Sequence, residues 1–198
     1  ALLNDAQRAA IRYLDGPCLV LAGAGSGKTR VITHKIAHLI DAGVSADCIG
    51  AITFTNKAAQ EMGERLEKMV RLPAGKRPLV STFHSLGMQI LRRDGERLGL
   101  KRSFSILDAD DAAGILAGAL ATTDRKVVRA AQHQISLWKN ALIDPEQAAA
   151  AAASGGERSF ALAWREHAAT LSAYQAVDFD DLILLPVRLL HEHADIAQ

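Results

Sequence analysis

The chain has 198 residues, of which 49% are apolar and 23% charged, a composition ordinary for a folded globular protein of one large domain or two small ones. The longest apolar run is the six alanines at 148–153, well below the roughly 18 residues needed to cross a bilayer, so we expect no membrane segment. The two cysteines, Cys18 and Cys48, are too few for a disulfide scaffold, and we expect both in the core of a protein from a reducing compartment. The net charge is only +1, but residues 1–100 hold 14 Lys or Arg against 9 Asp or Glu, which weakly favours a polyanionic partner.

The first 56 residues contain two strand patterns separated by a helix pattern. Residues 18–21 form a short apolar run, and three of the next six residues are glycine. From Val31 to Ile40 the apolar residues return at helical spacing, so the sequence predicts a buried strand, a turn and a helix. Residues 49–53 repeat the strand pattern, and Asn56 is the expected N-cap of the helix that follows.

A third strand is expected at residues 79–83, before a helix that runs through Leu86 and Leu91. Strands that alternate with helices of this length indicate an α/β fold with a parallel sheet covered by helices on both faces. From about Asp108 the pattern becomes helical and rich in alanine. We therefore expect a separate helical subdomain after the α/β part.

Several residues mark the ends of helices in the second half. Asp144 followed by Pro145 predicts a helix start, and Ser-Gly-Gly at 154–156 predicts a stop, so the alanines between them are expected to be helical. Asp178 or Asp180 is expected to cap a last apolar helix. Pro186 lies inside that pattern and should kink or split the helix.

The glycine-rich turn leads directly into Lys28 and Thr29, the arrangement of a phosphate-binding loop between a strand and a helix. A triphosphate concentrates negative charge in a small volume, so binding it requires converging backbone N–H groups, and glycines let the backbone come close. Lys28 would reach the β- and γ-phosphates, and the Thr29 hydroxyl would bind Mg²⁺. The alternative is a glycine-rich turn before a basic helix.

Two further candidate ligand-binding segments follow the second and third expected strands. Carboxyl ends of parallel strands are where open α/β sheets bind ligands. Each segment offers hydroxyl or amide groups and one aromatic ring, the combination that single-stranded nucleic acid requires. Composition alone favours core phenylalanines with capping residues instead. The residues concerned are Phe54, Thr55, Asn56, Thr82, Phe83 and His84.

Other polar groups are better explained by structure than by chemistry. The acidic residues at 178–181 could suggest a metal cluster, but carboxylates are favourable at any helix N-terminus. Asp108 follows a short strand-like run and is expected to cap a helix. His34 and His38 are four residues apart but lack a third ligand at suitable spacing, and His84-Ser85 lacks the glycine pattern of a hydrolase nucleophile.

Taken together, these segments resemble the superfamily 1A DNA helicases of the UvrD, Rep and PcrA type, most closely the Rep type, over essentially the whole chain. Leu-Asn-Asp-Ala-Gln at 3–7 resembles the Q motif, and Ala-Gly-Ala-Gly-Ser-Gly-Lys-Thr at 22–29 resembles motif I, in which this family has Ala first. Residues 52–62 resemble motif Ia, and Thr-Phe-His-Ser-Leu at 82–86 resembles the next DNA-contacting motif. The Asp-Phe-Asp-Asp segment after Val177 is similar to the stretch that leads back into the core domain.

The resemblance implies an ATP- and Mg²⁺-dependent motor that moves 3′ to 5′ on single-stranded DNA and unwinds duplexes at a single-strand to double-strand junction. It implies a P-loop, RecA-like core at 1–87, an all-helical insertion at 88–176 and a return segment at 177–198. Lys126, Arg129 and Lys139 in the insertion are candidate phosphate contacts. The implied setting is the bacterial cytoplasm near the nucleoid, as a monomer or a DNA-induced dimer without membrane association. Nucleotide contacts are implied for Gln7, Ala22, Gly23, Ala24, Gly25, Ser26, Gly27, Lys28, Thr29 and Arg30.

The family's second carboxylate motif and its arginine finger come after the Asp-Phe-Asp-Asp segment and are not among these 198 residues. Hydrolysis needs groups from both sides of the nucleotide, so we expect weak nucleotide binding and little turnover. Two alternatives stay open. One is a subunit of a helicase-nuclease, and the other is a non-enzymatic nucleotide- or DNA-binding module.

Overall fold

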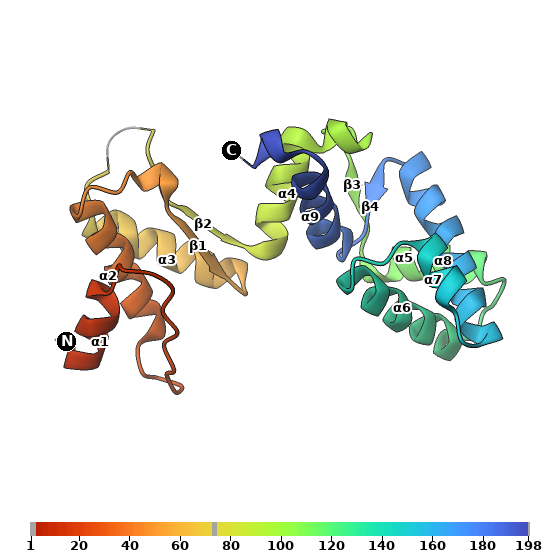
Figure 1. Ribbon diagram of the computed structural model, residues 1–198, viewed down its shortest axis with the longest axis horizontal. Helices are drawn as coiled ribbons and strands as arrows, with labels where there is room; N and C mark the ends of the chain where they lie inside the picture. The colour runs from red at the N-terminus through yellow and green to blue at the C-terminus, as the bar shows by residue number, and fades with distance from the viewer. Residues whose placement is uncertain (1–2, 73–74, 198) are drawn as a thin grey trace. The chain divides into compact units, whose positions relative to one another are not determined.

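The computed structural model describes residues 3–72 and 75–197, which belong to two compact units, Ala1–Phe83 and His84–Gln198 (Figure 1). The fold is α/β and mostly helical, with small parallel sheets.

The first unit is built around two parallel strands. Strand β1 (Gly50–Thr53) pairs with β2 (Leu79–Thr82), with Gly50 opposite Leu79. Helix α2 (Lys28–Asp41) and helix α3 (Asn56–Met69) pack together, and α3 contacts both strands. Their shared core consists of Ile36, Ile49, Ala51, Met62 and Leu66. Helix α1 (Asp5–Arg12) packs on α2, and a short 3₁₀ turn, η1 (Ala46–Cys48), precedes β1.

The strand expected at residues 18–21 is not formed, and this prediction was wrong. Leu19 and Leu21 are 86% and 88% exposed. A parallel strand needs hydrogen bonds from a neighbouring strand, and no described residue pairs with this segment. Cys18 in this segment and Cys48 in η1 are both exposed, so the expectation of core cysteines was also wrong.

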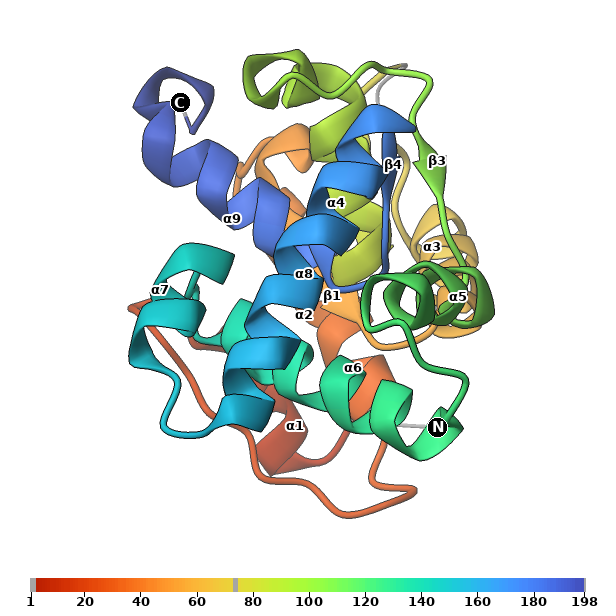
Figure 2. The same cartoon turned by 90° about the vertical axis from the view of Figure 1, so that its right-hand side faces the viewer.

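The second unit is a cluster of helices with a two-residue parallel ladder. Helix α8 (Gly155–Ala173) contacts α5 (Ala109–Ala119), α6 (Arg125–Asn140) and α7 (Pro145–Ala151) (Figure 2). Strand β3 (Ser105–Ile106) pairs with β4 (Ala176–Val177), a strand that the sequence pattern did not predict. The unit also contains α4 (Phe83–Asp94), which begins at the last residue of the first unit, η2 (Gly95–Leu98), α9 (Asp181–Glu192) and η3 (Ala194–Ile196).

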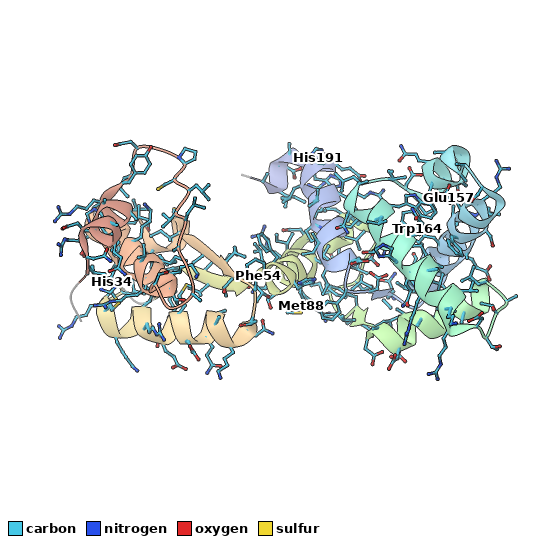
Figure 3. The ribbon with its side chains drawn as sticks, turned by 90° about the horizontal axis from the view of Figure 1, so that it is seen from below. His34, Phe54, Met88, Glu157, Trp164 and His191 are labelled. Atoms are coloured by element: carbon cyan, nitrogen blue, oxygen red, sulfur yellow. The ribbon has the colours of Figure 1, made fainter. Side chains whose placement is uncertain are left out.

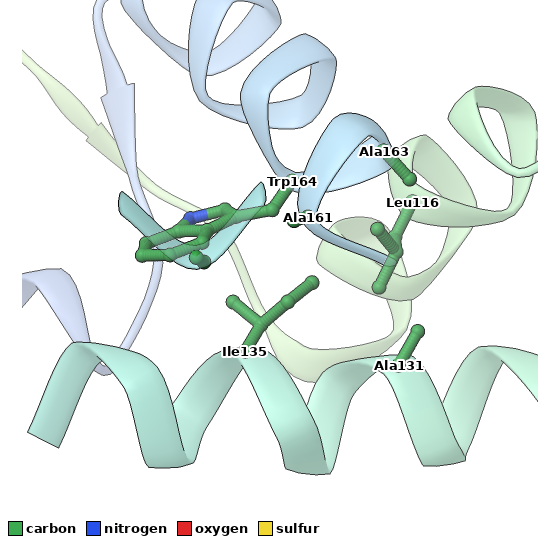
Figure 4. Close-up of a cluster of buried hydrophobic side chains, with 7 residues drawn as sticks. Leu116, Ala131, Ile135, Ala161, Ala163 and Trp164 are labelled. Carbon is green, nitrogen blue, oxygen red and sulfur yellow. The ribbon is translucent and has the colours of Figure 1, made fainter. Parts of the chain in front are cut away.

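The core of the helical cluster combines one tryptophan with small residues. Trp164 on α8 is 3% exposed and stacks on Trp138 of α6, with ring centroids 6.0 Å apart. Ala131 of α6 and Ala161 of α8 are fully buried in the same cluster, where small side chains let the helices pack without leaving space between them (Figure 4). The alanine-rich sequence is therefore a packing surface as well as a helix former.

Most of the expected helix ends are confirmed. Asp108 caps α5 by accepting from the backbone N–H groups of Asp110 and Asp111, and Asp144 caps α7 with Pro145 as its first residue. Three details differ. Thr55 rather than Asn56 caps α3; α7 ends at Ala151, slightly before the expected stop, and Ser154 caps the next helix, α8; and α9 continues through Pro186 without splitting.

Helix α4 comes close to α9 at Gly87. A Cβ at this position would lie 1.8 Å from the carbonyl oxygen of Leu182, far inside van der Waals contact. Only a residue without a side chain allows this helix crossing.

We expect Gly87→Ala to lower the free energy of unfolding by at least about 1–3 kcal/mol, because an added methyl must push two backbones apart. Gly114→Ala is the matched control: Gly114 also lies inside a helix, and a Cβ there meets nothing within 4 Å. The control should be stabilised by about 0.5–1 kcal/mol through helix propensity. Urea denaturation measures both, and equal stability of the two variants would contradict the close crossing.

Candidate functional site

The glycine-rich loop before α2 has backbone conformations that require glycine. Gly25 and Gly27 have φ values of 73° and 83°, in the left-handed region. A Cβ at Gly27 would be strained, and it would also lie 3.2 Å from the Gln7 amide nitrogen. These glycines let the loop curl back just before the helix begins at Lys28.

The Lys28 ammonium closes this loop into a ring. Its Nζ atom donates to the carbonyl oxygens of Ala22, at 3.2 Å, and Gly23, at 2.9 Å. The Ser26 hydroxyl also donates to the Gly23 carbonyl, at 2.7 Å. An ammonium has three donors, so one N–H of Lys28 is left over after the two carbonyl bonds. The ring therefore holds a positive charge with one donor available to an anion.

The N-terminus of α2 is suited to the same kind of ligand. Its N-cap, Gly27, provides no side-chain hydrogen bond, and the first turn contains no acidic residue. The first N–H groups of a helix have no partner within the helix and carry a partial positive charge. Thr29, the second residue of α2, brings a hydroxyl next to these groups. The residues present therefore fit a phosphate chain with its magnesium ion.

Gln7 joins α1 to this loop. Its Oε1 accepts from the backbone N–H of Asn4 at 3.0 Å, within a capping box, and its Nε2 donates to the Ser26 carbonyl at 3.0 Å. These two bonds fix which end of the amide is oxygen and which is nitrogen. One N–H and one lone pair stay available, and Arg30 lies on the same side of Gly27. The structure thus brings Gln7, the loop and Arg30 together.

The ends of β1 and β2 present the second group of candidate residues. Phe54 directly follows β1 and is 93% exposed, so the alternative of a core phenylalanine was wrong (Figure 3). Thr55 accepts from the Ala58 N–H, and Thr82 donates to Asn56 Oδ1 at 3.4 Å. The side chains at the two strand ends are therefore linked across the sheet.

Phe83 and His84 start α4, and both are exposed. Within the second unit, the His84 ring lies 5.1 Å from the ring of Phe179, which is 58% exposed. Sequence reasoning did not single out Phe179. The only available signal was its place in the Asp-Phe-Asp-Asp segment, since no periodicity relates it to a residue 95 positions earlier.

The three basic residues considered as phosphate contacts do not share one environment. Lys126 and Arg129 on α6 are exposed. Lys139, at the end of the same helix, is 4% exposed and bonds to both Asp178 and Asp181. Lys139 is therefore not placed to meet a phosphate, because two carboxylates already occupy its ammonium. These two aspartates form an ion cluster and do not join a group of three or more metal-ligating side chains anywhere in 3–72 or 75–197.

A protein-family comparison matches residues 3–198 to the UvrD/REP helicase N-terminal domain. The chain belongs to this family. It is 46% identical to the ATP-dependent DNA helicase Rep of Escherichia coli over 98% of this chain and 29% of that protein. It is 41% identical to a probable DNA helicase II homolog of Mycoplasma capricolum and 40% identical to the ATP-dependent DNA helicase PcrA of Bacillus subtilis, over 98% and 99% of this chain.

The chain spans about 30% of the length of these UvrD/REP relatives, 29%, 28% and 27% respectively. Among the described residues, none of the helices is both long enough and apolar enough to cross a membrane.

Lys28→Ala should weaken nucleotide binding by about 10- to 150-fold, because a charge-assisted hydrogen bond contributes roughly 1.5–3 kcal/mol. Titration of a fluorescent ATP analogue measures this, with thermal unfolding as a check that the chain is folded. Lys68→Ala is the control, since Lys68 is an exposed lysine in the last turn of α3 and makes no bond to the loop that the structure shows. Unchanged affinity of Lys28→Ala would remove its phosphate role.

Proposed function

We propose that this chain is the ATP- and DNA-binding N-terminal part of an ATP-dependent DNA helicase that moves 3′ to 5′ on single-stranded DNA. The observation that carries this proposal is the closed loop at the start of α2. There Lys28 donates hydrogen bonds back to the Ala22 and Gly23 carbonyls, and no side chain caps the helix. The names of the UvrD/REP relatives support it. The proposed organisation is a P-loop, RecA-like core at 1–87, a helical insertion at 88–176 and a return segment at 177–198.

At the nucleotide, each residue of the loop has one proposed task. Lys28 directs its third donor to the β- and γ-phosphates, Thr29 offers its hydroxyl to Mg²⁺, and the backbone of 22–27 surrounds the phosphates. Cleavage of ATP supplies the free energy for movement along DNA. The remaining N–H and lone pair of Gln7 match adenine, which offers an acceptor nitrogen beside an amino donor on one edge. Arg30 lies near the base.

For DNA, the proposed contacts are the strand-end residues of the first unit and, separately, the aromatic pair of the second unit. Phe54 and Phe83 offer exposed rings on which bases stack, whatever their sequence. Thr55, Asn56 and Thr82 supply hydroxyl and amide groups for the backbone. Within the second unit, His84 with Phe179 is a further proposed base contact, and the exposed Lys126 and Arg129 are proposed phosphate contacts near the duplex at a junction. The expected setting is the bacterial cytoplasm, near the nucleoid, as a monomer or a DNA-induced dimer.

We expect the 198-residue chain to bind a fluorescent ATP analogue but to hydrolyse ATP at least about 1,000-fold more slowly than the full-length Escherichia coli relative. A missing transition-state arginine alone costs roughly 10³–10⁵ in rate. Steady-state hydrolysis with and without single-stranded DNA measures this. DNA-stimulated turnover at the relative's rate would mean that an acidic residue such as Asp108 completes the site within this chain.

Phe54→Ala should weaken binding of single-stranded DNA by about 1–3 kcal/mol without lowering the melting temperature, because the ring stacks a base and does not pack in the core. Fluorescence anisotropy with a labelled oligonucleotide measures the affinity. Phe104→Leu is the matched control: Phe104 is 1% exposed, so its loss should lower the melting temperature but leave affinity per folded molecule intact. The reverse pattern would assign Phe54 to the core.

A further inference from the structure

The clearest feature that the proposed function leaves unused is the buried ammonium of Lys139. Its Nζ atom lies 2.7 Å from Asp178 Oδ2 and 2.8 Å from Asp181 Oδ1. The side chains are 4%, 16% and 14% exposed. The last turn of α6 is thereby tied to the short segment that leads from β4 into α9.

The same two aspartates also hold the backbone of that segment. The Asp181 N–H donates to Asp178 Oδ1 at 2.9 Å, and the Asp178 N–H donates to Asp181 Oδ2 at 3.2 Å. Phe179 lies inside this closed turn, and its carbonyl accepts from the Leu182 N–H. Its ring leaves the turn toward solvent, against His84, at an interplanar angle of 49°. The direction of the Phe179 ring therefore depends on the conformation of residues 178–181.

That conformation depends in turn on the charge of Lys139. Burial disfavours the ammonium, but the carboxylates of Asp181 and Asp178 outweigh burial and raise the pKa of Lys139. Burial also opposes ionisation of Asp178, yet the Lys139 charge outweighs it and lowers the pKa of that carboxyl. Burial and the neighbouring Asp178 raise the pKa of Asp181. Two buried carboxylates in one turn repel each other unless the ammonium lies between them.

The other titratable group at this place does not replace the lysine. Burial lowers the pKa of His167 below its ordinary value and outweighs the Asp178 carboxylate, which raises it, while the Lys139 charge lowers it further. Among the described residues, Lys139 is the only cation within ion-pair distance of either aspartate.

We propose that Lys139 is a positioning residue for DNA binding: it holds the turn at 178–181 and thereby sets the Phe179 ring beside His84. This inference rests on the proposed DNA-binding function. Lys139 itself does not touch DNA, because it is buried and both of its observed bonds go to carboxylates.

The first test is the salt dependence of binding by the Lys139→Met variant to a labelled single-stranded oligonucleotide. Loss of one stacked base predicts an affinity loss of roughly 5- to 150-fold, as for Phe179→Ala. The slope of log affinity against log salt should stay at the wild-type value. A slope lower by about 0.7, the value for one lost phosphate contact on a single strand, would show that Lys139 meets DNA directly and overturn the proposal.

The second test is a double-mutant cycle with Phe179→Ala. If Lys139 acts through the ring, adding Lys139→Met to Phe179→Ala should change the affinity less than about twofold, a difference within the error of such cycles. Independent, multiplicative losses would overturn the proposal.

A further variant separates positioning from folding. Lys139→Met combined with Asp178→Asn and Asp181→Asn removes all three charges but keeps side-chain oxygens that accept the two backbone N–H bonds. This variant should recover the wild-type affinity within a few fold, even if Lys139→Met alone fails to fold. A folded triple variant that still binds as weakly as Phe179→Ala would overturn the proposal.

A readout without DNA keeps the two proposals apart. In the wild type, the Phe179 ring should shift the His84 ring-proton resonances upfield, and both Lys139→Met and Phe179→Ala should abolish this shift. A shift preserved in Lys139→Met overturns the positioning role. A lost shift with unchanged DNA affinity in both variants instead overturns the assignment of Phe179 to the DNA surface.

Discussion

A buried charge must have counter-charges in contact, and this requirement organises the second unit. The Lys139 ammonium can stay charged among helices only because Asp178 and Asp181 reach it. Removing one partner of such a pair typically costs about 3–5 kcal/mol, a large part of the roughly 5–15 kcal/mol that holds a domain folded. The segment between β4 and α9, which holds both aspartates, must therefore pass beside the last turn of α6.

Other contacts follow from this return. It places β4 beside β3, with Ala176 opposite Ser105, and it starts α9 at the position where Gly87 of α4 leaves room for the Leu182 carbonyl. The turn that makes the return also carries the exposed Phe179 ring. In this unit, one polar cluster thus sets the backbone path, a helix crossing and a solvent-facing aromatic pair.

In the first unit, the corresponding constraint is the satisfaction of backbone groups around the loop at 22–27. Lys28 and Gln7 bond to the loop carbonyls of Ala22, Gly23 and Ser26, so side chains of this unit hold the loop backbone in its curled conformation. An ordered loop loses less conformational freedom when it binds a phosphate, which favours affinity. After these bonds, one donor of Lys28 and one donor and one acceptor of Gln7 are still available for a ligand. Their directions are set because the other groups of the same side chains are already bonded.

Much of the local structure was predictable from the sequence because local forces decide it. The strand at 50–53, the cap at Asp108 and the start of α7 at Asp144 and Pro145 depend on neighbours within a few residues. The loop ending in Lys28 was recognisable for the same reason, since its glycines and its lysine are adjacent in the chain. The misplaced strand at 18–21 shows the limit: its apolar pattern is correct for a strand, but pairing needs a partner that pattern cannot supply.

The sequence by itself therefore determined the helices and their caps, the glycine-rich loop before Lys28 and the family resemblance. Only the tertiary structure decided that Phe54 is exposed, that Phe179 faces His84 and that Lys139 is buried between two aspartates. Residues 39 and 95 positions apart meet in these contacts, and burial and charge pairing between such residues arise only when the chain packs. A lysine in an amphipathic helix has the same sequence pattern whether it faces water or an ion pair.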